Sequence, residues 1–274
     1  MLKTRIFLAA AAILLVVLIF NLPRVVVSND PDSITGDANE NAPSDSTAMA
    51  AHVPELSPED RDRAEALKEK LELAKNTEKS IIFADSLAAL YLKIGKYDSA
   101  ARFIEIVANE NPSLENLKRA GNVYYEAYGF AMDAERQAAL GEKAQSYFSL
   151  ILKEEPDNLE VKNKLAMTYL TTSNPMMGIM MLREILEEDP DNEEALFNMG
   201  VLSMQSGQYE KAVERFEDLT AKYSDNIQAQ FFLGVSYLET GKKEKARTQF
   251  ELVKTLDEDP AVHAAADAYL EEIN

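Results

Sequence analysis

The residue types that carry most enzyme chemistry are scarce in this sequence. It contains no cysteine and only two histidines, His52 and His263. Thiolate catalysis, iron–sulfur clusters and cysteine-bound zinc are therefore excluded. No nucleophile, base and orienting group recur together at a readable spacing. We expect a protein that is not an enzyme and that holds no cofactor and no metal ion.

One methionine cluster has residue types that suit a soft metal ion. Thioether sulfur is a ligand for Cu(I), and Met176, Met177, Met180 and Met181 recur at helical spacing. Methionines at this spacing more often fill irregular gaps in packing or form a docking surface, and we prefer that interpretation. The acidic stretch 187–194 lacks the glycine and the terminal glutamate of a calcium loop.

Charge restricts the class of partner. The chain of 274 residues has 28 Lys and Arg against 47 Asp and Glu, so its net charge is −19. Binding to nucleic acid needs a basic footprint that neutralises phosphates, and this composition argues against it. Apolar residues make up 46% of the chain, which is enough for a sizeable core. A protein partner is the better expectation.

The amino-terminal end predicts a membrane anchor. Residues 6–20 are all apolar, and the stretch reaches the lower limit of a bilayer span when it is counted through Leu22. Lys3 and Arg5 precede it, whereas no Lys or Arg occurs between Arg24 and Arg61. The positive-inside rule then places the amino terminus in the cytoplasm and the rest of the chain across the membrane.

We therefore predict a single-pass anchor over 1–27 in the cell (inner) membrane, with the remaining chain periplasmic. A secretory signal peptide that is cleaved after Ser28 is the alternative. Residues 28–56 are rich in Ser, Asp, Asn, Ala and Pro and show no apolar period, which is typical of a disordered acidic linker.

The carboxy-terminal two thirds of the chain repeat with a period of 34 residues. Segments 159–192, 193–226 and 227–260 align without gaps. In each, a small residue is followed twelve positions later by a second small residue and four positions after that by a large apolar one. These sets are Ala166, Gly178 and Leu182; Gly200, Ala212 and Phe216; and Gly234, Ala246 and Phe250. Small residues let two helices approach closely, so each segment predicts a packed helix pair.

Turn residues recur with the same period. Gly207 and Gly241 fall where a first helix should end in a left-handed residue, and Pro156 and Pro190 should stop second helices. We expect the next helices to be capped by Asp157, Asp191 and Asp225.

With this pattern the chain resembles the tetratricopeptide repeat family, whose unit is a helix–turn–helix of 34 residues. A fourth copy fits at 81–114, where Ala88, Tyr91, Gly95 and Ala100 stand in the expected places. The resemblance implies an all-α solenoid of about five such repeats, which follows the N-terminal transmembrane helix. A helix over 57–80 should precede the stack, and a capping helix over 261–274 should close it.

A fifth copy, at 115–158, carries an insertion of eleven residues. Eleven residues are almost three helical turns, so both helices of the pair can lengthen without rotating their packing faces. We predict a helical hairpin that protrudes from the stack. Gly129 should stop its first helix and Asp133 should cap its second, although Gly141 is an alternative break.

The family resemblance implies that the first helices line a groove that binds peptides or segments of a partner. In the last three repeats the residues expected to face this groove are apolar. They are Met167, Leu170, Phe197, Val201, Met204, Phe231, Val235 and Leu238. The alternative for any single residue is a core position, because an error of one position in the helical phase exchanges the two faces.

A second set of candidates lies in the interrupted repeat. Some members of the family bind a carboxy-terminal carboxylate through a Lys and an Asn one turn apart, and Lys118 and Asn122 match that pair, with Tyr125 on the same helix. Glu194 and Asn198 stand where the supporting basic residues should be, so a complete clamp is not expected.

These observations favour a membrane-tethered scaffold that binds a segment of an envelope protein. Two alternatives remain open: an assembly factor or holdase for exported clients, and a homo-oligomeric structural protein.

Overall fold

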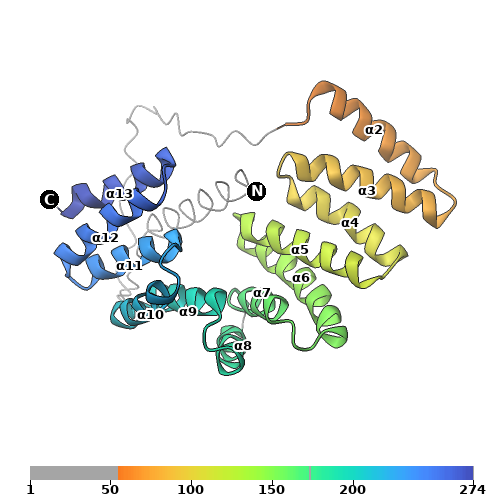
Figure 1. Ribbon diagram of the computed structural model, residues 1–274. Coiled ribbons are helices and arrows are strands. Elements are labelled where there is room, and N and C mark those ends of the chain that lie inside the picture. The colour runs from red at the N-terminus through yellow and green to blue at the C-terminus, as the bar shows by residue number, and fades with distance from the viewer. Residues whose placement is uncertain (1–54, 173, 274) are drawn as a thin grey trace, which may run out of the picture. The chain divides into compact units, whose positions relative to one another are not determined.

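Every element in the described part of the chain is an α-helix. The computed structural model describes residues 55–172 and 174–273, and these ranges contain twelve helices and no strand (Figure 1). The helices are α2 (Pro58–Glu72), α3 (Thr77–Lys93), α4 (Tyr97–Glu110), α5 (Leu114–Phe130), α6 (Ala134–Glu154), α7 (Leu159–Tyr169), α8 (Pro175–Glu188), α9 (Glu193–Gln205), α10 (Tyr209–Lys222), α11 (Ile227–Glu239), α12 (Lys243–Leu256) and α13 (Pro260–Ile273). The predicted all-α fold is confirmed.

The predicted membrane anchor lies outside the described residues. Within 55–172 and 174–273, no helix combines the length and the apolar character that crossing a bilayer requires.

The helices form two compact units. In the first, α3 packs on α4, α5 on α6, α7 on α8 and α9 on α10, and consecutive pairs contact each other through α4 and α5, α6 and α7, and α8 and α9. Helix α2 packs on α3. In the second unit, α11 packs on α12, and α13 contacts both of them. The first unit is thus a stack of helix pairs, as the period predicts.

Within a helix pair, a small residue on the first helix makes room for a phenylalanine ring of the second helix, as the repeat predicts. A Cβ atom added to Gly121 would lie 2.9 Å from the ring of Phe148, and one added to Gly200 would lie 2.6 Å from the ring of Phe216. Both rings are fully buried. The second unit repeats the arrangement with Gly234 and Phe250.

The turns follow the expected chemistry, but the caps are displaced by one residue. Gly207 and Gly241 have φ angles of 69° and 73°, which confirms the predicted left-handed turns. The helix caps are not the predicted Asp157, Asp191 and Asp225. Instead, the side chains of Asn158, Asn192 and Asn226 accept the backbone N–H three residues ahead, at 3.0, 3.1 and 2.8 Å. An asparagine that adjoins the aspartate satisfies the free N–H of the first turn equally well, so composition alone does not separate the two.

The inserted residues lengthen α5 and α6. Asp133 caps α6 as predicted, because its carboxylate accepts the N–H of Arg136 at 2.8 Å. Gly129 does not stop α5, which continues to Phe130. Gly141 does not break α6 either. Its missing side chain makes room for the ring of Tyr128, which a Cβ atom would approach to 3.2 Å.

The tip of this hairpin rests against the preceding helix pair. The ring of Phe130 stacks on Tyr97 at the start of α4 with 5.0 Å between centroids. Arg136 forms an ion pair with Asp98 in the first turn of the same helix. The hairpin was predicted to protrude from the stack. These two contacts instead attach the end of α5 and the first turn of α6 to α4.

The helix expected over 57–80 is interrupted. Ser57 caps α2 as predicted, because its hydroxyl accepts the N–H of Asp60 at 3.0 Å. The helix ends at Glu72, and α3 begins at Thr77, because the side chain of Asn76 accepts the N–H of Lys79 at 2.8 Å and starts a new helix.

Candidate partner-binding face

Three consecutive first helices of the first unit present their side chains at matching positions. On α5, α7 and α9, residues spaced by three, four and seven share one side of each helix. We call this surface the first-helix face. Its members are Lys118, Asn122, Tyr125 and Glu126 on α5; Glu160, Asn163, Lys164 and Met167 on α7; and Glu194, Phe197, Asn198 and Val201 on α9.

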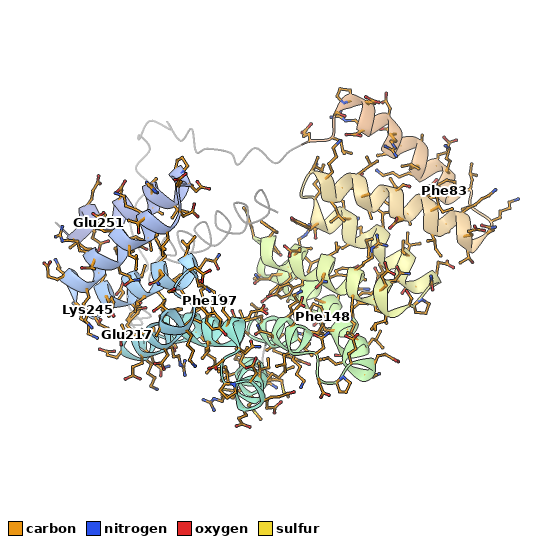
Figure 2. All side chains as sticks on the ribbon, viewed as in Figure 1. Phe83, Phe148, Phe197, Glu217, Lys245 and Glu251 are labelled. Carbon is orange, nitrogen blue, oxygen red and sulfur yellow. The ribbon has the colours of Figure 1, made fainter. Side chains whose placement is uncertain are left out.

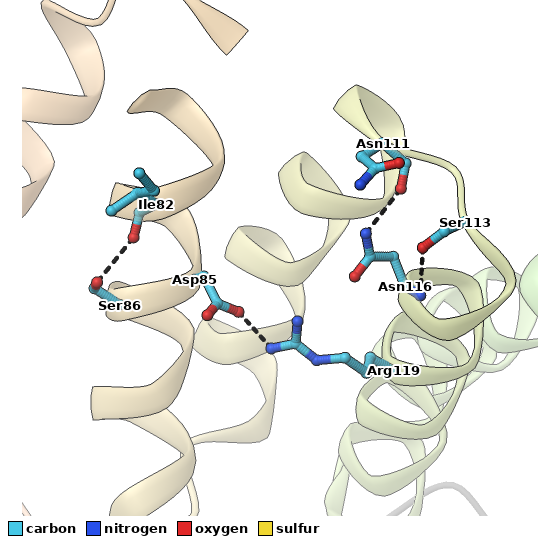
Figure 3. Close-up of polar contacts among 7 residues, drawn as sticks. All are labelled: Ile82, Asp85, Ser86, Asn111, Ser113, Asn116 and Arg119. Atoms are coloured by element: carbon cyan, nitrogen blue, oxygen red, sulfur yellow. Dashed lines mark hydrogen bonds and ion pairs between the residues drawn. The ribbon is translucent and has the colours of Figure 1, made fainter. Parts of the chain in front are cut away.

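Hydrogen bonds between neighbouring first helices join this face to α3. Arg119 of α5 forms an ion pair with Asp85 of α3, as Figure 3 shows. Lys164 of α7 donates to Asn122 of α5 at 2.9 Å, and Asn198 of α9 donates to Asn163 of α7 at 3.1 Å. We call these three contacts the polar ladder. Each of them positions one first helix against the next.

Both residues that resemble a carboxylate clamp form hydrogen bonds within the chain, and one of them belongs to the polar ladder. Lys118 donates to Glu155 at 2.7 Å, and Asn122 accepts the bond from Lys164. Both members of the pair are thus held within the chain. The sequence likewise has Glu194 and Asn198 where a complete clamp needs basic residues. A binding role for Lys118 and Asn122 stays a prediction.

Several predicted apolar residues of the first unit are half-buried. Tyr125 stacks on Tyr128 with 5.9 Å between ring centroids. Phe197, which is labelled in Figure 2, meets Phe216 edge to face at 6.0 Å. Met167, Leu170 and Val201 are likewise partly exposed. A methyl group of Leu170 lies against Gly178 of α8, since a Cβ atom added at that glycine would be 2.9 Å from it. The other four keep part of their surface at the first-helix face.

Three of the predicted groove residues are core residues instead. Met204, Phe231 and Val235 are only 9, 8 and 1% exposed. Phe231 meets Phe250 and Tyr269 edge to face at 5.4 and 5.5 Å, so α12 and α13 cover its ring. Leu238 is half-buried. A shift of one position in the helical phase is the reason for the error, because large apolar residues occur on both sides of these helices.

The first-helix face carries residues that the sequence reasoning missed. Glu126, Glu160 and Asn163 were not among its candidates. The signal that could have found part of the polar ladder is the repeat period itself: Asp85 and Arg119 are 34 residues apart, and Asn163 and Asn198 are 35 apart. Paired polar residues at that separation belong to neighbouring first helices.

Two of the three carboxylates of this face, those of Glu126 and Glu194, have raised pKa values, whereas the side chain of Glu160 is 68% exposed. Loss of water raises the pKa of Glu126, an effect that Lys164 opposes. Loss of water also raises the pKa of Glu194; the Asn163 amide and then Lys164 oppose this rise, whereas Glu160 reinforces it. Burial likewise raises the pKa of the Tyr125 hydroxyl, and the nearby carboxylate of Glu194 adds to that rise. Glu194 of α9 therefore lies near Tyr125 of α5.

The methionine cluster is divided between core and surface. Met181 packs against the core, whereas Met176, Met177 and Met180 are exposed. Met181 therefore fills a gap in packing as expected, and a docking role for the three exposed methionines stays a prediction. The residues that the structure describes contain no group of three His, Asp or Glu placed to hold a metal ion.

The architecture defines a class of protein built from stacked helix–turn–helix repeats. The tetratricopeptide repeat family model matches residues 179–230 and 203–268. No curated protein matches the chain. The family-model match is thus confined to residues 179–268, where the chain has the helix pairs that the family's repeat unit predicts.

One solved structure of a repeat protein shares the fold, and two others are similar to a lower degree. A tetratricopeptide repeat protein from Parabacteroides merdae is 18% identical, and the match covers 78% of this chain and 81% of that chain with a TM-score of 0.56. YrrB, described as a repeat protein with an unusual peptide-binding site, is 20% identical and covers 75% of this chain and 98% of its own, with a TM-score of 0.43. The MamA protein is 17% identical, with coverage of 67 and 95% and a TM-score of 0.46.

Proposed function

We propose that this protein is a non-enzymatic scaffold of the tetratricopeptide repeat type, which binds a peptide or helical segment of another protein on the first-helix face. The observation that carries the proposal is the composition of that face. Partly exposed apolar side chains, Tyr125, Met167, Phe197 and Val201, alternate there with polar groups on three helices that the polar ladder holds in place. Interfaces combine apolar anchors with fixed polar groups in this way.

The proposal includes a tether. The apolar stretch at 6–20 supports an anchor in the inner membrane, and the composition of 28–56 supports a flexible acidic linker between the bilayer and the helices. The helical units then lie on the periplasmic side, and the partner is an envelope or membrane protein. Extraction of membranes with alkaline carbonate, followed by intact-mass measurement, tests this. An anchored chain stays with the membrane at full mass, whereas a cleaved chain is released at lower mass.

Photo-crosslinking in cells tests the binding face. A benzophenone amino acid placed at Val201 samples the first-helix face, and the same group at Leu150, an exposed position on the second helix α6, is the matched control. We expect an adduct of one defined partner from position 201 and none from position 150. Phe231 is unsuitable for this test because its ring is part of the core.

The pattern of adducts distinguishes the alternatives. Adducts with many unrelated exported chains would indicate an assembly factor or holdase. An adduct at twice the mass of the chain would indicate self-association. Equal adducts from positions 150 and 201, or adducts from 150 alone, would move the binding site away from the first-helix face.

A further inference from the structure

An acidic cluster with a single cation lies within the first-helix face. Glu126 of α5, Glu160 of α7 and Glu194 of α9 lie around Lys164, whose charge affects both Glu126 and Glu194. The ammonium group of Lys164 already donates to Glu160 at 2.6 Å and to Asn122 at 2.9 Å. Glu126 and Glu194 form no ion pair with any of the described residues. Within the ranges 55–172 and 174–273, Glu126 and Glu194 therefore have only Lys164 as a nearby cation, and Lys164 is already paired with Glu160.

A buried amide next to this cluster has a free donor. Asn163 is 1% exposed, and its Oδ1 atom accepts the bond from Asn198. Its Nδ2 atom has no hydrogen-bond partner in the described part of the chain. The amide lies close enough to Glu194 to offset part of the rise in the pKa of that carboxyl, but it does not reach hydrogen-bond geometry. A buried unpaired donor is costly, so an acceptor supplied by a ligand would be favourable.

The surroundings favour an organic cation over a bare metal ion. Tyr125 lies near Glu194, and Phe197 is one turn along α9 from that carboxylate. Aromatic rings beside a carboxylate suit the aliphatic stem and charged end of a Lys or Arg side chain. A metal ion would need three or more ligating groups in one place, and the described residues offer no such group. The net charge of −19 adds a general attraction for a basic segment.

We propose that this cluster receives a Lys or Arg side chain from an extended segment of the partner, with Glu126 and Glu194 accepting its charge and Asn163 donating to a main-chain carbonyl of the same segment. The inference rests on the proposed function, because it specifies the chemistry of the segment that the first-helix face binds. It also assigns the unpaired amide and the two unpaired carboxylates to one ligand.

Selection from a peptide library tests the proposal without knowledge of the partner. The full chain, purified in detergent because residues 6–20 are apolar, is immobilised and exposed to phage that display random peptides. We expect the enriched peptides to share a Lys or Arg. The best peptide is then synthesised, together with a version that carries norleucine in place of the basic residue, and the Kd of each is measured by fluorescence anisotropy.

Variants of the chain complete the test. We expect the double variant Glu126→Gln and Glu194→Gln to weaken binding about tenfold or more, and Asn163→Leu to weaken it as well. The matched control is Glu115→Gln with Glu184→Gln, which removes the same charge from exposed positions on α5 and α8 and should change Kd by less than about twofold. Circular dichroism confirms that each variant is folded.

The outcomes separate the two proposals. Enriched peptides without Lys or Arg, or peptides whose Kd is the same for both double variants, would overturn the cation assignment. If Val201→Asp still abolishes their binding, the first-helix face remains the binding site. A chain that enriches no peptide at all would count against the proposed function itself, and the inference would fail with it.

Discussion

Glu126 shows at the scale of one residue how a binding group can cost stability. Its pKa is raised because neighbouring atoms remove water from the carboxylate. The folded chain then binds a proton more readily than the unfolded chain does, so stability falls as the pH rises through the interval between the unfolded and folded pKa values. At neutral pH the charged carboxylate is therefore unfavourable in the folded state.

We predict that Glu126→Gln raises the free energy of unfolding at pH 7. The gain should shrink as the pH falls and should vanish below the pKa of an unfolded glutamate, about 4.3, where both states are protonated. Urea denaturation at a series of pH values measures it, with Glu115→Gln as the control. A variant that is less stable than the parent at pH 7 would show that the carboxylate forms a favourable contact.

Two helical glycines allow a matched comparison of packing. A Cβ atom at Gly178 would collide with the backbone oxygen of Ala166 and would lie 2.9 Å from the side chain of Leu170, whereas one at Gly129 would meet nothing within 4 Å. We predict that Gly178→Ala lowers stability by about 1–3 kcal/mol, because α7 and α8 must separate. Gly129→Ala should raise stability by about 0.5–1 kcal/mol.

Thermal and urea denaturation of the two glycine variants give the comparison directly. Similar changes for both, in either direction, would mean that α7 and α8 are not in close contact at Gly178.

Residue-level prediction from sequence succeeds where one residue type fits and fails where two do. Gly207 and Gly241 were predictable because a left-handed turn strongly favours glycine. Asn158 was mistaken for its neighbour Asp157, since both side chains can cap a helix. Phe231 was assigned to a groove because periodicity identifies an apolar stripe but not the neighbour that covers it.

At the scale of elements, the long hairpin of α5 and α6 differs from the other pairs by the support at its tip. The stack of Phe130 on Tyr97 and the ion pair of Arg136 with Asp98 attach that tip to α4. The base of the hairpin is held separately by Phe148 against Gly121. The length of the insertion predicted the extension of both helices. Its contacts with the preceding pair depend on tertiary packing that a repeat period does not encode.

We predict that Phe130→Ala loosens the tip and leaves the base intact. Loss of the ring stack removes about 0.5–1.5 kcal/mol in addition to the buried area. Amide hydrogen exchange followed by mass spectrometry should then show faster exchange in the first turn of α6, with no change around Phe148.

Leu150→Ala is the control for this experiment, because Leu150 is exposed on α6, the helix whose exchange is measured. Faster exchange throughout α5 and α6 in the Phe130 variant would instead show that the hairpin opens as one unit.

At the scale of the whole molecule, the acidic character of the chain should govern its encounters. If the partner segment is basic, attraction to a chain of net charge −19 accelerates association. Raising the ionic strength from about 0.1 M to about 1 M shortens the screening length from about 10 Å to about 3 Å. We predict that the association rate constant falls steeply over this range while the dissociation rate constant changes little.

Surface plasmon resonance with the selected peptide measures both rate constants. An association rate constant that does not change with salt would indicate an uncharged ligand. It would contradict the proposal that the cluster receives a Lys or Arg side chain.

The order of contacts in the first unit has a mechanical consequence. Its principal helix contacts join helices that are at most two apart along the chain, and each bond of the polar ladder ties a first helix only to the next one. When force is applied to its two ends, such an array unfolds one hairpin at a time and not all at once. A molecule that is fixed to a surface at one end and pulled by its partner at the other would therefore lengthen in steps, and each step would limit the force on the attachment.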